Sequence, residues 1–306
     1  MRNDFKGDRF RFMLDFQPLE IDKIPIYKQY YNYTNALGCE FNFVSGFLWN
    51  KEYLLRAAFY DDTLIKAYFR DDTIIWGYCL PAGKNVKGAV EAAICDARER
   101  GQTPSFGYLS KDERDTLEEL FPERFCYERV YDTCDYIYLT RDLALLEGKR
   151  YHAKRNHIAQ FYRTYPDARF AALDDGNLSD ARRVMELWCA ENGIRPEDHG
   201  EYAVLCDALS NYKKLCMRGA VLYAGGNPVA MTLGSEISGL CFDVNFEKAL
   251  RSCVGSYAVI NNEFAKTLTD YKYINREEDL GIEGLRKSKL SYYPAIIYDR
   301  FEATLK

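Results

Sequence analysis

Residues 53–80 read YLLRAAFYDDTLIKAYFRDDTIIWGYCL. Three apolar, aromatic runs are separated here by the aspartate pairs at 61–62 and 71–72, a pattern typical of three antiparallel strands joined by tight turns. The elements expected next are a helix from Val86 to near Gly101, a strand at 105–109, a helix that Ser110 opens with Glu113 in the capping-box position, and a strand around 136–139.

The second half of the chain repeats this order of elements. Two helices of its own come first, at about residues 179–192 and 201–215. After them we expect strands at 220–224, 229–237 and 240–244, a helix at 254–268, a strand at 271–275, a helix at 281–291 and a strand at 295–301. Residue identity between the halves is negligible, so the repeat is one of architecture.

A three-stranded meander with a right-handed helical crossover to a parallel strand gives a mixed sheet with helices on its faces. This layout resembles the Gcn5-related N-acetyltransferase (GNAT) fold. We therefore expect an α/β (α+β) protein of two tandem GNAT-like domains, at residues 1–145 and 146–306, each a mixed sheet with helices on both faces. In that fold two parallel strands separate after the meander and the acyl donor enters between them, and we place the active site in the second domain.

Composition excludes several classes of protein. Of 306 residues, 47% are hydrophobic, which excludes a disordered chain, and the net charge of -5 excludes a globally basic nucleic-acid binder. No apolar run approaches the ~18 residues that span a bilayer, and no secretory signal is evident, so we expect a soluble, cytoplasmic protein. The ten cysteines are dispersed without zinc-site spacing. We expect reduced thiols, no metal and no cofactor.

A concentrated positive charge lies in residues 149–161, KRYHAKRNHIAQF. Between Gly148 and Pro166 there are five Lys or Arg residues and no acidic residue. One interpretation is a solvated helix face, and the other is a helix that contacts phosphates. The phosphate-binding candidates are Lys149, Arg150, Lys154 and Arg155.

A second unusual segment, residues 275–294, reads NREEDLGIEGLRKSKLSYYP. It follows a predicted strand at the carboxyl edge of the parallel pair, where open sheets usually bind ligands. On a helix, Asp279, Glu283 and Arg286 would lie within an arc of roughly 60°, and Lys289 would flank them. The alternative interpretation is a salt-bridge ladder along the helix, such as Glu283 with Lys287.

These two segments resemble the family of uncharacterised bacterial proteins related to the C-terminal catalytic domain of phosphatidylglycerol lysyltransferase. The resemblance covers nearly the whole chain, and its most specific part is residues 283–289. It implies a tandem acyltransferase fold that moves an amino acid from aminoacyl-tRNA to a lipid headgroup. The lipid transferase carries membrane-spanning helices ahead of its catalytic part, and this sequence shows none. The acceptor is therefore left open as an amine or a hydroxyl, with a phospholipid headgroup at the membrane surface as one choice.

The resemblance also implies roles for individual residues. Arg286 and Lys289 would bind anionic groups, while Asp279 or Glu283 would orient the α-amine of the donor or relay a proton. The expected substrate-binding residues are Asn275, Arg276, Glu277, Lys287 and Tyr292.

Two other functions remain open. One is an acyl-CoA-dependent N-acyltransferase that would use the helix start at 254–256, although Val254 stands where the first glycine of the CoA-binding loop belongs. The other is a non-catalytic tandem module that binds a nucleotide, an amino acid or a partner protein.

Overall fold

The computed structural model of the protein describes residues 13–31 and 36–306. Its contacts divide the chain into two compact units. The first unit comprises Met1–Leu19, Tyr53–Arg129 and Phe301–Lys306, and the second comprises Glu20–Glu52 and Val130–Arg300. The units therefore interleave along the chain, and the single division expected after residue 145 does not coincide with them.

The first unit is built on a mixed sheet that has eight strands in the described residues. These are β1 (Gln17–Pro18), β2 (Leu55–Tyr60), β3 (Thr63–Phe69), β4 (Ile75–Tyr78), β5 (Ala82–Gly83), β6 (Ser105–Leu109), β7 (Phe125–Arg129) and β15 (Phe301–Leu305). Their order is β1-β2-β3-β4-β6-β15-β7, with β5 on β3. Helices α4 (Val86–Glu99) and α5 (Lys111–Leu120) pack into its core, and the capping box of Ser110 with Glu113 is present.

Two-residue turns set the register of the first hairpin in each meander. Asp61 and Asp62 both adopt positive φ angles, 45° and 55°, and join Tyr60 directly to its strand partner Thr63. Gly225 and Gly226 do the same between β10 and β11 of the second unit. Asp and Gly are among the residues that tolerate this left-handed backbone, which explains why the sequence places them there.

The second unit is built on a seven-stranded sheet in the order β14-β8-β13-β12-β11-β10-β9. Its strands are β8 (Asp135–Leu139), β9 (Arg169–Ala172), β10 (Arg218–Ala224), β11 (Asn227–Ser238), β12 (Cys241–Ala249), β13 (Tyr273–Asn275) and β14 (Ile296–Tyr298). Its α-helices are α1 (Ile24–Tyr31), α2 (Phe43–Leu48), α3 (Asn50–Tyr53, which runs into the first unit), α6 (Thr140–Leu145), α7 (His152–Thr164), α8 (Leu178–Glu191), α9 (Gly200–Asn211), α10 (Ser256–Lys266) and α11 (Glu283–Leu290). Short 3-10 turns are η1 (Ile21–Lys23), η2 (Cys39–Phe41), η3 (Tyr131–Thr133), η4 (Lys149–Tyr151) and η5 (Pro196–Asp198).

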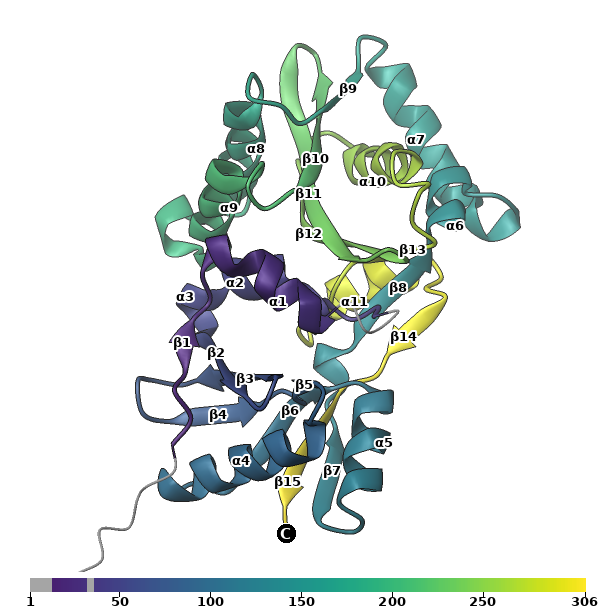
Figure 1. The fold of residues 1–306 in the computed structure, drawn as a ribbon. Coiled ribbons are helices and arrows are strands. Elements are labelled where there is room, and N and C mark those ends of the chain that lie inside the picture. The colour runs from purple at the N-terminus through teal and green to yellow at the C-terminus, as the bar shows by residue number, and fades with distance from the viewer. Residues whose placement is uncertain (1–12, 32–35) are drawn as a thin grey trace, which may run out of the picture. The chain divides into compact units, whose positions relative to one another are not determined.

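Helices cover both faces of this second sheet (Figure 1). Along β10, Ala220 and Leu222 pack into the core shared with α6, α7 and α10, while Val221 packs into the core shared with α8 and α9. This alternation follows from the two-residue period of a strand and makes β10 apolar on both sides. The expected fold class is confirmed, with two tandem GNAT-like mixed α/β sheets.

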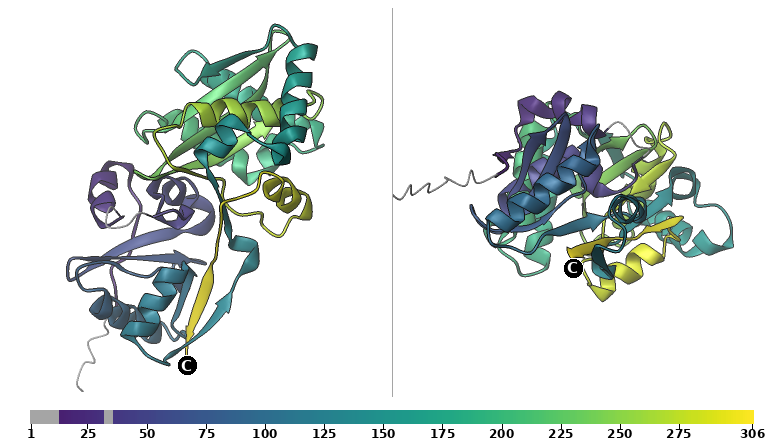
Figure 2. Two further views of the ribbon diagram at one scale, coloured as in Figure 1. Left: turned by 90° about the vertical axis from the view of Figure 1, so that its right-hand side faces the viewer. Right: turned by 60° about the horizontal axis from the view of Figure 1, so that its bottom comes forward.

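Two strands do not belong to the sheet that their position in the sequence predicts. Each belongs to the other sheet. The strand predicted around 136–139 as the end of the first half is β8, which pairs with β13 and β14 of the second sheet. The strand predicted at 295–301 is divided into β14 and β15, and β15 inserts between β6 and β7 of the first sheet (Figure 2). An apolar run predicts a strand but not its partner, because backbone hydrogen bonds are the same for every sequence.

The helix predicted at 281–291 begins only at Glu283. Leu280 and Gly281 adopt positive φ angles of 53° and 72°, which no right-handed helix accommodates. Asp279 therefore lies in a turn ahead of α11 rather than on its surface.

Gly234 on β11 provides a test of this packing. A Cβ atom at this position would lie 2.1 Å from the carbonyl oxygen of Asp243 on β12, so we expect Gly234→Ala to lower the free energy of unfolding by about 3 kcal/mol. The matched control is Gly107→Ala on β6, where an added Cβ meets no atom within 4 Å and the change should stay within about 0.5 kcal/mol. Urea unfolding of both variants gives the comparison, and equal stabilities would contradict the close approach of β11 to β12.

Candidate active site

The parallel strands β12 and β13 are inner strands of the second sheet and separate at their carboxyl ends. They pair only over residues 241–243 and 273–275, after which β12 continues to Ala249. Beyond Asn275 the chain instead bonds to β8, where the Arg276 amide donates to the Tyr136 carbonyl oxygen at 3.0 Å. Side chains bridge the strands after they separate, since Arg276 forms a 2.7 Å ion pair with Glu247 of β12.

The backbone that follows β13 is held by Lys289 from α11. Its ammonium group donates to the carbonyl oxygens of Arg276, Glu277 and Glu278, at 2.5 Å and 2.9 Å for the first two. An ammonium group has three N–H donors, so all of them are engaged. Glu277 adopts a positive φ of 55° in this loop, and its amide donates to Asn275 Oδ1 at 2.7 Å. Lys289 thus fixes the direction of the Glu277 and Glu278 side chains.

Four carboxylates gather around this loop and form what we call the acidic cluster: Asp135, Asp243, Glu277 and Glu278. Asp243 and Asn275 are paired across β12 and β13, and Ile137 of β8 pairs with Asn275, so these residues and Asp135 lie on one face of the sheet. Burial raises the pKa values of Asp243, Glu277 and Glu278, and each is raised further by neighbouring members of the cluster.

Asp135 organises the buried side of the cluster. Its Oδ2 accepts hydrogen bonds from the Cys39 amide, from Asn275 Nδ2 and from the guanidinium group of Arg300, at 2.7–2.8 Å. Arg300 is 1% exposed and also forms an ion pair with Glu40. A buried arginine between two carboxylates satisfies the requirement that buried charges be paired. The segment from Cys39 to Asn42 is thereby fixed over the sheet.

Asp279 and Arg286 form a separate ion pair beside Tyr136 of β8. Arg286 Nε donates to Asp279 Oδ2 at 2.7 Å and its NH2 group to Oδ1 at 2.8 Å, while Tyr136 and the Gly281 amide also donate to this carboxylate. The bonds from Arg286 lower the pKa of Asp279 to about 2. Because both of its oxygens accept hydrogen bonds, the Asp279 carboxylate is a very weak base near neutral pH.

Comparisons with known proteins show which family the chain belongs to. Residues 31–304 match the family described as phosphatidylglycerol lysyltransferase, C-terminal. The chain belongs to this family. A conserved protein of unknown function from Bacteroides thetaiotaomicron is 34% identical, with 96% of this chain and 100% of that chain covered and a TM-score of 0.89.

Two solved structures of lower identity share the fold of this family member. The C-terminal domain of a putative lysylphosphatidylglycerol synthetase from Agrobacterium fabrum is 12% identical with a TM-score of 0.66, over 93% of this chain and 92% of that chain. The L-PGS of Bacillus licheniformis is 13% identical with a TM-score of 0.63, over 92% of both chains.

A curated relative of this family member, an uncharacterised protein of Mycoplasmoides gallisepticum, is 23% identical over 173 residues. That match spans 55% of this chain and about half, 54%, of the relative. Within the described ranges, no helix combines the length and apolar character needed to cross a bilayer.

The structure brings several residues expected in the 275–294 segment together where β12 and β13 separate, namely Asn275, Arg276, Glu277 and Lys289. Asp279 and Arg286 pair with each other beside Tyr136 of β8. Tyr292 is buried below Lys154, whose ammonium nitrogen lies 3.7 Å from the centre of its ring. Glu283 and Lys287 are exposed on α11 and have no part in this arrangement. The chemical roles assigned to all these residues stay predictions.

In the basic segment, residues 149–163, two arginines and a lysine already form contacts within the second unit. Arg150 pairs with Asp142 at 2.7 Å, and Arg155 donates to the carbonyl oxygens of Leu146 and Gly148. Lys154 donates to Ser291 at 2.7 Å, and its burial and the charge of Arg276 lower its pKa to about 8. Lys149, Arg150 and Arg155 remain largely exposed and available to an anionic partner.

Sequence reasoning missed Cys39, Asp135, Asp243, Glu278 and Arg300. One signal was available for Asp243. Polar residues alternate with apolar ones from Phe242 to Phe246, which marks a polar face on a strand that is otherwise apolar. Cys39 offers no such signal, because its partner Asp135 is 96 residues away along the chain.

The Asp279–Arg286 pair predicts a stability difference that depends on pH. The folded pKa of Asp279 is lower than its unfolded pKa of about 3.9, so its contribution is present above that value and is lost as the pH falls from about 5 to 2. Arg286→Gln should therefore cost about 2 kcal/mol at pH 7 and much less near pH 2.

Urea unfolding of wild type and variant at several pH values measures this difference. The matched control is Arg183→Gln, which removes an exposed pair with Glu186 and should cost less than about 1 kcal/mol. A cost for Arg286→Gln that does not change with pH would show that the two side chains are not paired in solution.

Proposed function

We propose that this chain transfers an aminoacyl group from aminoacyl-tRNA to an amine or hydroxyl acceptor, such as a phospholipid headgroup. Family and fold indicate an acyltransferase related to the lysylphosphatidylglycerol synthases. The observation that carries the finer proposal is the acidic cluster at the point where β12 and β13 separate. Carboxylates outnumber ammonium and guanidinium groups there, which favours a donor whose acyl group carries a positive charge.

The reaction needs little chemical assistance, because the aminoacyl ester is already activated. The acceptor oxygen or nitrogen attacks the ester carbonyl carbon, the new acyl bond forms, and the bond to the terminal ribose oxygen of the tRNA breaks. The proton of the acceptor is passed on to that leaving oxygen. Orientation of the two substrates is therefore the main task of the protein.

The acidic cluster is suited to orient the donor through its ammonium group. Glu277 and Glu278 point from the loop that Lys289 fixes, and Asp243 lies on the strand beside it. Glu277, Glu278 and Asp243 thus take the role expected from the sequence for Asp279 or Glu283, which is to orient the α-amine of the donor. Asp279 is already paired with Arg286, and Glu283 is exposed. Lys289 acts here by positioning the loop rather than by binding an anion.

The exposed cations of the basic segment supply contacts for the tRNA backbone. Lys149 and Arg163 are exposed at the two ends of this segment, and within the described part of the chain neither forms a hydrogen bond or ion pair of the kind that engages Arg155. Lysine and arginine side chains bind phosphates with release of counterions, so binding becomes weaker as salt rises.

A transfer assay tests the catalytic part of the proposal. The full chain is mixed with a pool of labelled aminoacyl-tRNAs and phosphatidylglycerol vesicles, and labelled lipid is counted. We expect transfer in wild type and a loss of about 100-fold in Glu277→Gln, because the variant keeps the shape of the side chain but removes its charge. Glu128→Gln, on an exposed position of β7, is the control and should be as active as wild type.

Absence of transfer to any lipid, peptide amine or small-molecule hydroxyl would contradict a transferase that uses this donor. Transfer that instead requires an acyl-CoA would support the N-acyltransferase alternative. Full activity in Glu277→Gln would show that the charge of the acidic cluster has no role in the transfer.

A binding experiment tests the tRNA separately. Lys149→Gln combined with Arg163→Gln should weaken tRNA binding and reduce the slope of log K against log salt by up to about 2. The control is Arg195→Gln combined with Lys214→Gln, which removes the same charge from exposed positions elsewhere in the unit. Filter binding across a salt series gives both slopes, and identical slopes for the two double variants would exclude the basic segment as the tRNA contact.

A further inference from the structure

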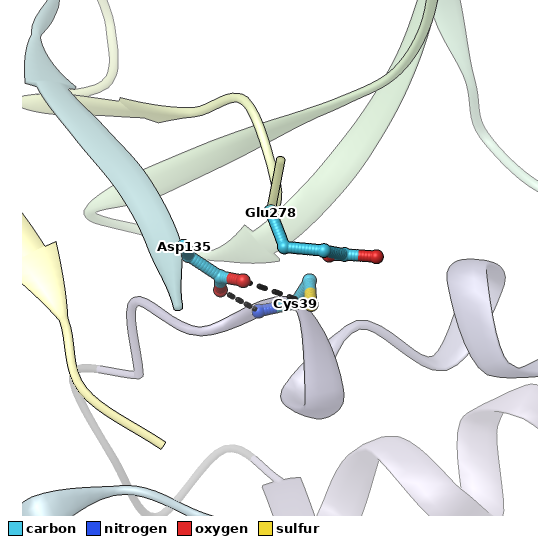
Figure 3. A group of neighbouring side chains, drawn as sticks. All are labelled: Cys39, Asp135 and Glu278. Carbon is cyan, nitrogen blue, oxygen red and sulfur yellow. Dashed lines mark hydrogen bonds between the residues drawn. The ribbon is translucent and has the colours of Figure 1, made fainter. Parts of the chain in front are cut away.

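Three side chains from distant parts of the sequence converge next to the site (Figure 3). Cys39 comes from η2, Asp135 from the start of β8 and Glu278 from the loop after β13. One ligand atom of each, a sulfur and two carboxylate oxygens, lies within 4.8 Å of the others. Cys39 and Glu278 are only half-buried, so an ion from solvent can reach them.

The two carboxylate oxygens of Asp135 have different hydrogen-bond partners. Oδ2 accepts three hydrogen bonds, from Cys39, Asn275 and Arg300. Oδ1 faces the Cys39 sulfur at 3.3 Å, so the thiol proton lies between two atoms that are both ligands for a metal. Zinc binds sulfur at about 2.3 Å and carboxylate oxygen at about 2.0–2.2 Å, and a sulfur–oxygen separation of this size suits a shared ion.

A second, independent observation comes from Asp243. This residue is fully buried, and among the described residues its Oδ1 accepts no hydrogen bond, while its Oδ2 accepts two, from Asn42 at 2.9 Å and from Asn245 at 3.2 Å. Asn42 follows Cys39 on the same segment, and Asp243 flanks Asn275 on the face of the sheet that carries Asp135. Asp243 therefore places an unpartnered, buried carboxylate oxygen beside these three ligands, although it lies outside the 4.8 Å group itself.

The balance of charges also favours binding of a cation. The carboxylates of this region are Asp135, Asp243, Glu277, Glu278 and Glu40. The cations that face them are Arg300, which is shared by Asp135 and Glu40, and Lys289, whose donors are all on backbone carbonyl groups. Excess negative charge in a buried region is costly unless a positive group compensates it.

We propose that Cys39, Asp135 Oδ1 and Glu278 bind one divalent transition-metal ion of the zinc type, with Asp243 or a water molecule as the fourth ligand. On binding, the S–H bond of Cys39 breaks, its proton passes to solvent, and the thiolate sulfur bonds to the metal. A thiolate ligand selects zinc-like ions over magnesium and calcium, which prefer oxygen. Ligand atoms that lie as far apart as the 4.8 Å limit must approach each other by about 1 Å to share one tetrahedral ion.

This site overlaps the acidic cluster that the proposed function gives to the donor. A bound metal would therefore compete with the ammonium group of the donor. The metal proposal does not rest on transferase activity, and it is tested without any transfer reaction.

Cobalt(II) is the probe, because a thiolate bound to it produces a charge-transfer absorption band in the near ultraviolet. The full chain, reduced and free of metal, is titrated with cobalt(II) and then with zinc. We expect a band that saturates at one ion per chain and disappears as zinc displaces cobalt. Cys39→Ala should lose the band, while Cys126→Ala, which removes an exposed thiol of the first unit, should keep it.

Absence of the band in wild type, or its persistence in Cys39→Ala, would overturn the proposal. Circular dichroism shows whether Cys39→Ala is folded. If it is not, Glu278→Gln decides, because loss of one of three protein ligands should weaken cobalt binding at least tenfold. Unchanged affinity in a folded Glu278→Gln variant would likewise overturn the proposal.

Discussion

The ammonium group of Lys289 donates to three consecutive carbonyl oxygens, and the candidate site depends on this contact. Those carbonyl groups belong to residues 276–278, which have left the β13 strand and have no ladder partner on the β12 side. Buried backbone acceptors need donors, and a lysine supplies three from one atom. The contact holds Glu277 in a left-handed conformation and so directs two adjacent glutamates toward the acidic cluster.

The second unit keeps several acidic groups in its interior. Each charge that serves the fold is neutralised locally, as in the pairs of Arg300 with Asp135 and of Arg276 with Glu247. The charges that remain on Asp243, Glu277 and Glu278 have no equivalent partner. An excess of this kind destabilises the folded state, and its retention is most simply explained by binding of a cationic group. Ammonium and metal ions are the two kinds of cation that the chemistry of these ligands accepts.

Much of the fold can be predicted from the sequence because it depends on local pattern. The meanders, the Asp61-Asp62 turn and the Ser110 capping box follow from apolar periodicity and turn chemistry, and the structure confirms them. The sheet to which β8 and β15 belong cannot be predicted in this way, because partner choice depends on contacts between distant residues.

The site was predictable in part. The density of charged residues marks the segment 275–294, and Asp279 pairs with Arg286, but from a turn ahead of α11 rather than along one helix face as predicted. Its sequence does not reveal that Lys289 faces backbone carbonyl groups, because a lysine has the same side chain whether it binds a ligand or a loop. Cys39 and Asp135 enter the site only through the packing of η2 on the sheet, which no local pattern records.

The central claim is that the acidic cluster receives the positively charged acyl group of the donor. A crystal structure of the chain with a non-hydrolysable aminoacyl-adenosine analogue tests this most directly. We predict that the ammonium nitrogen lies within hydrogen-bonding distance of Glu277, Glu278 or Asp243. An analogue bound with its ammonium group away from these three carboxylates, for example at the start of α10, would contradict the account.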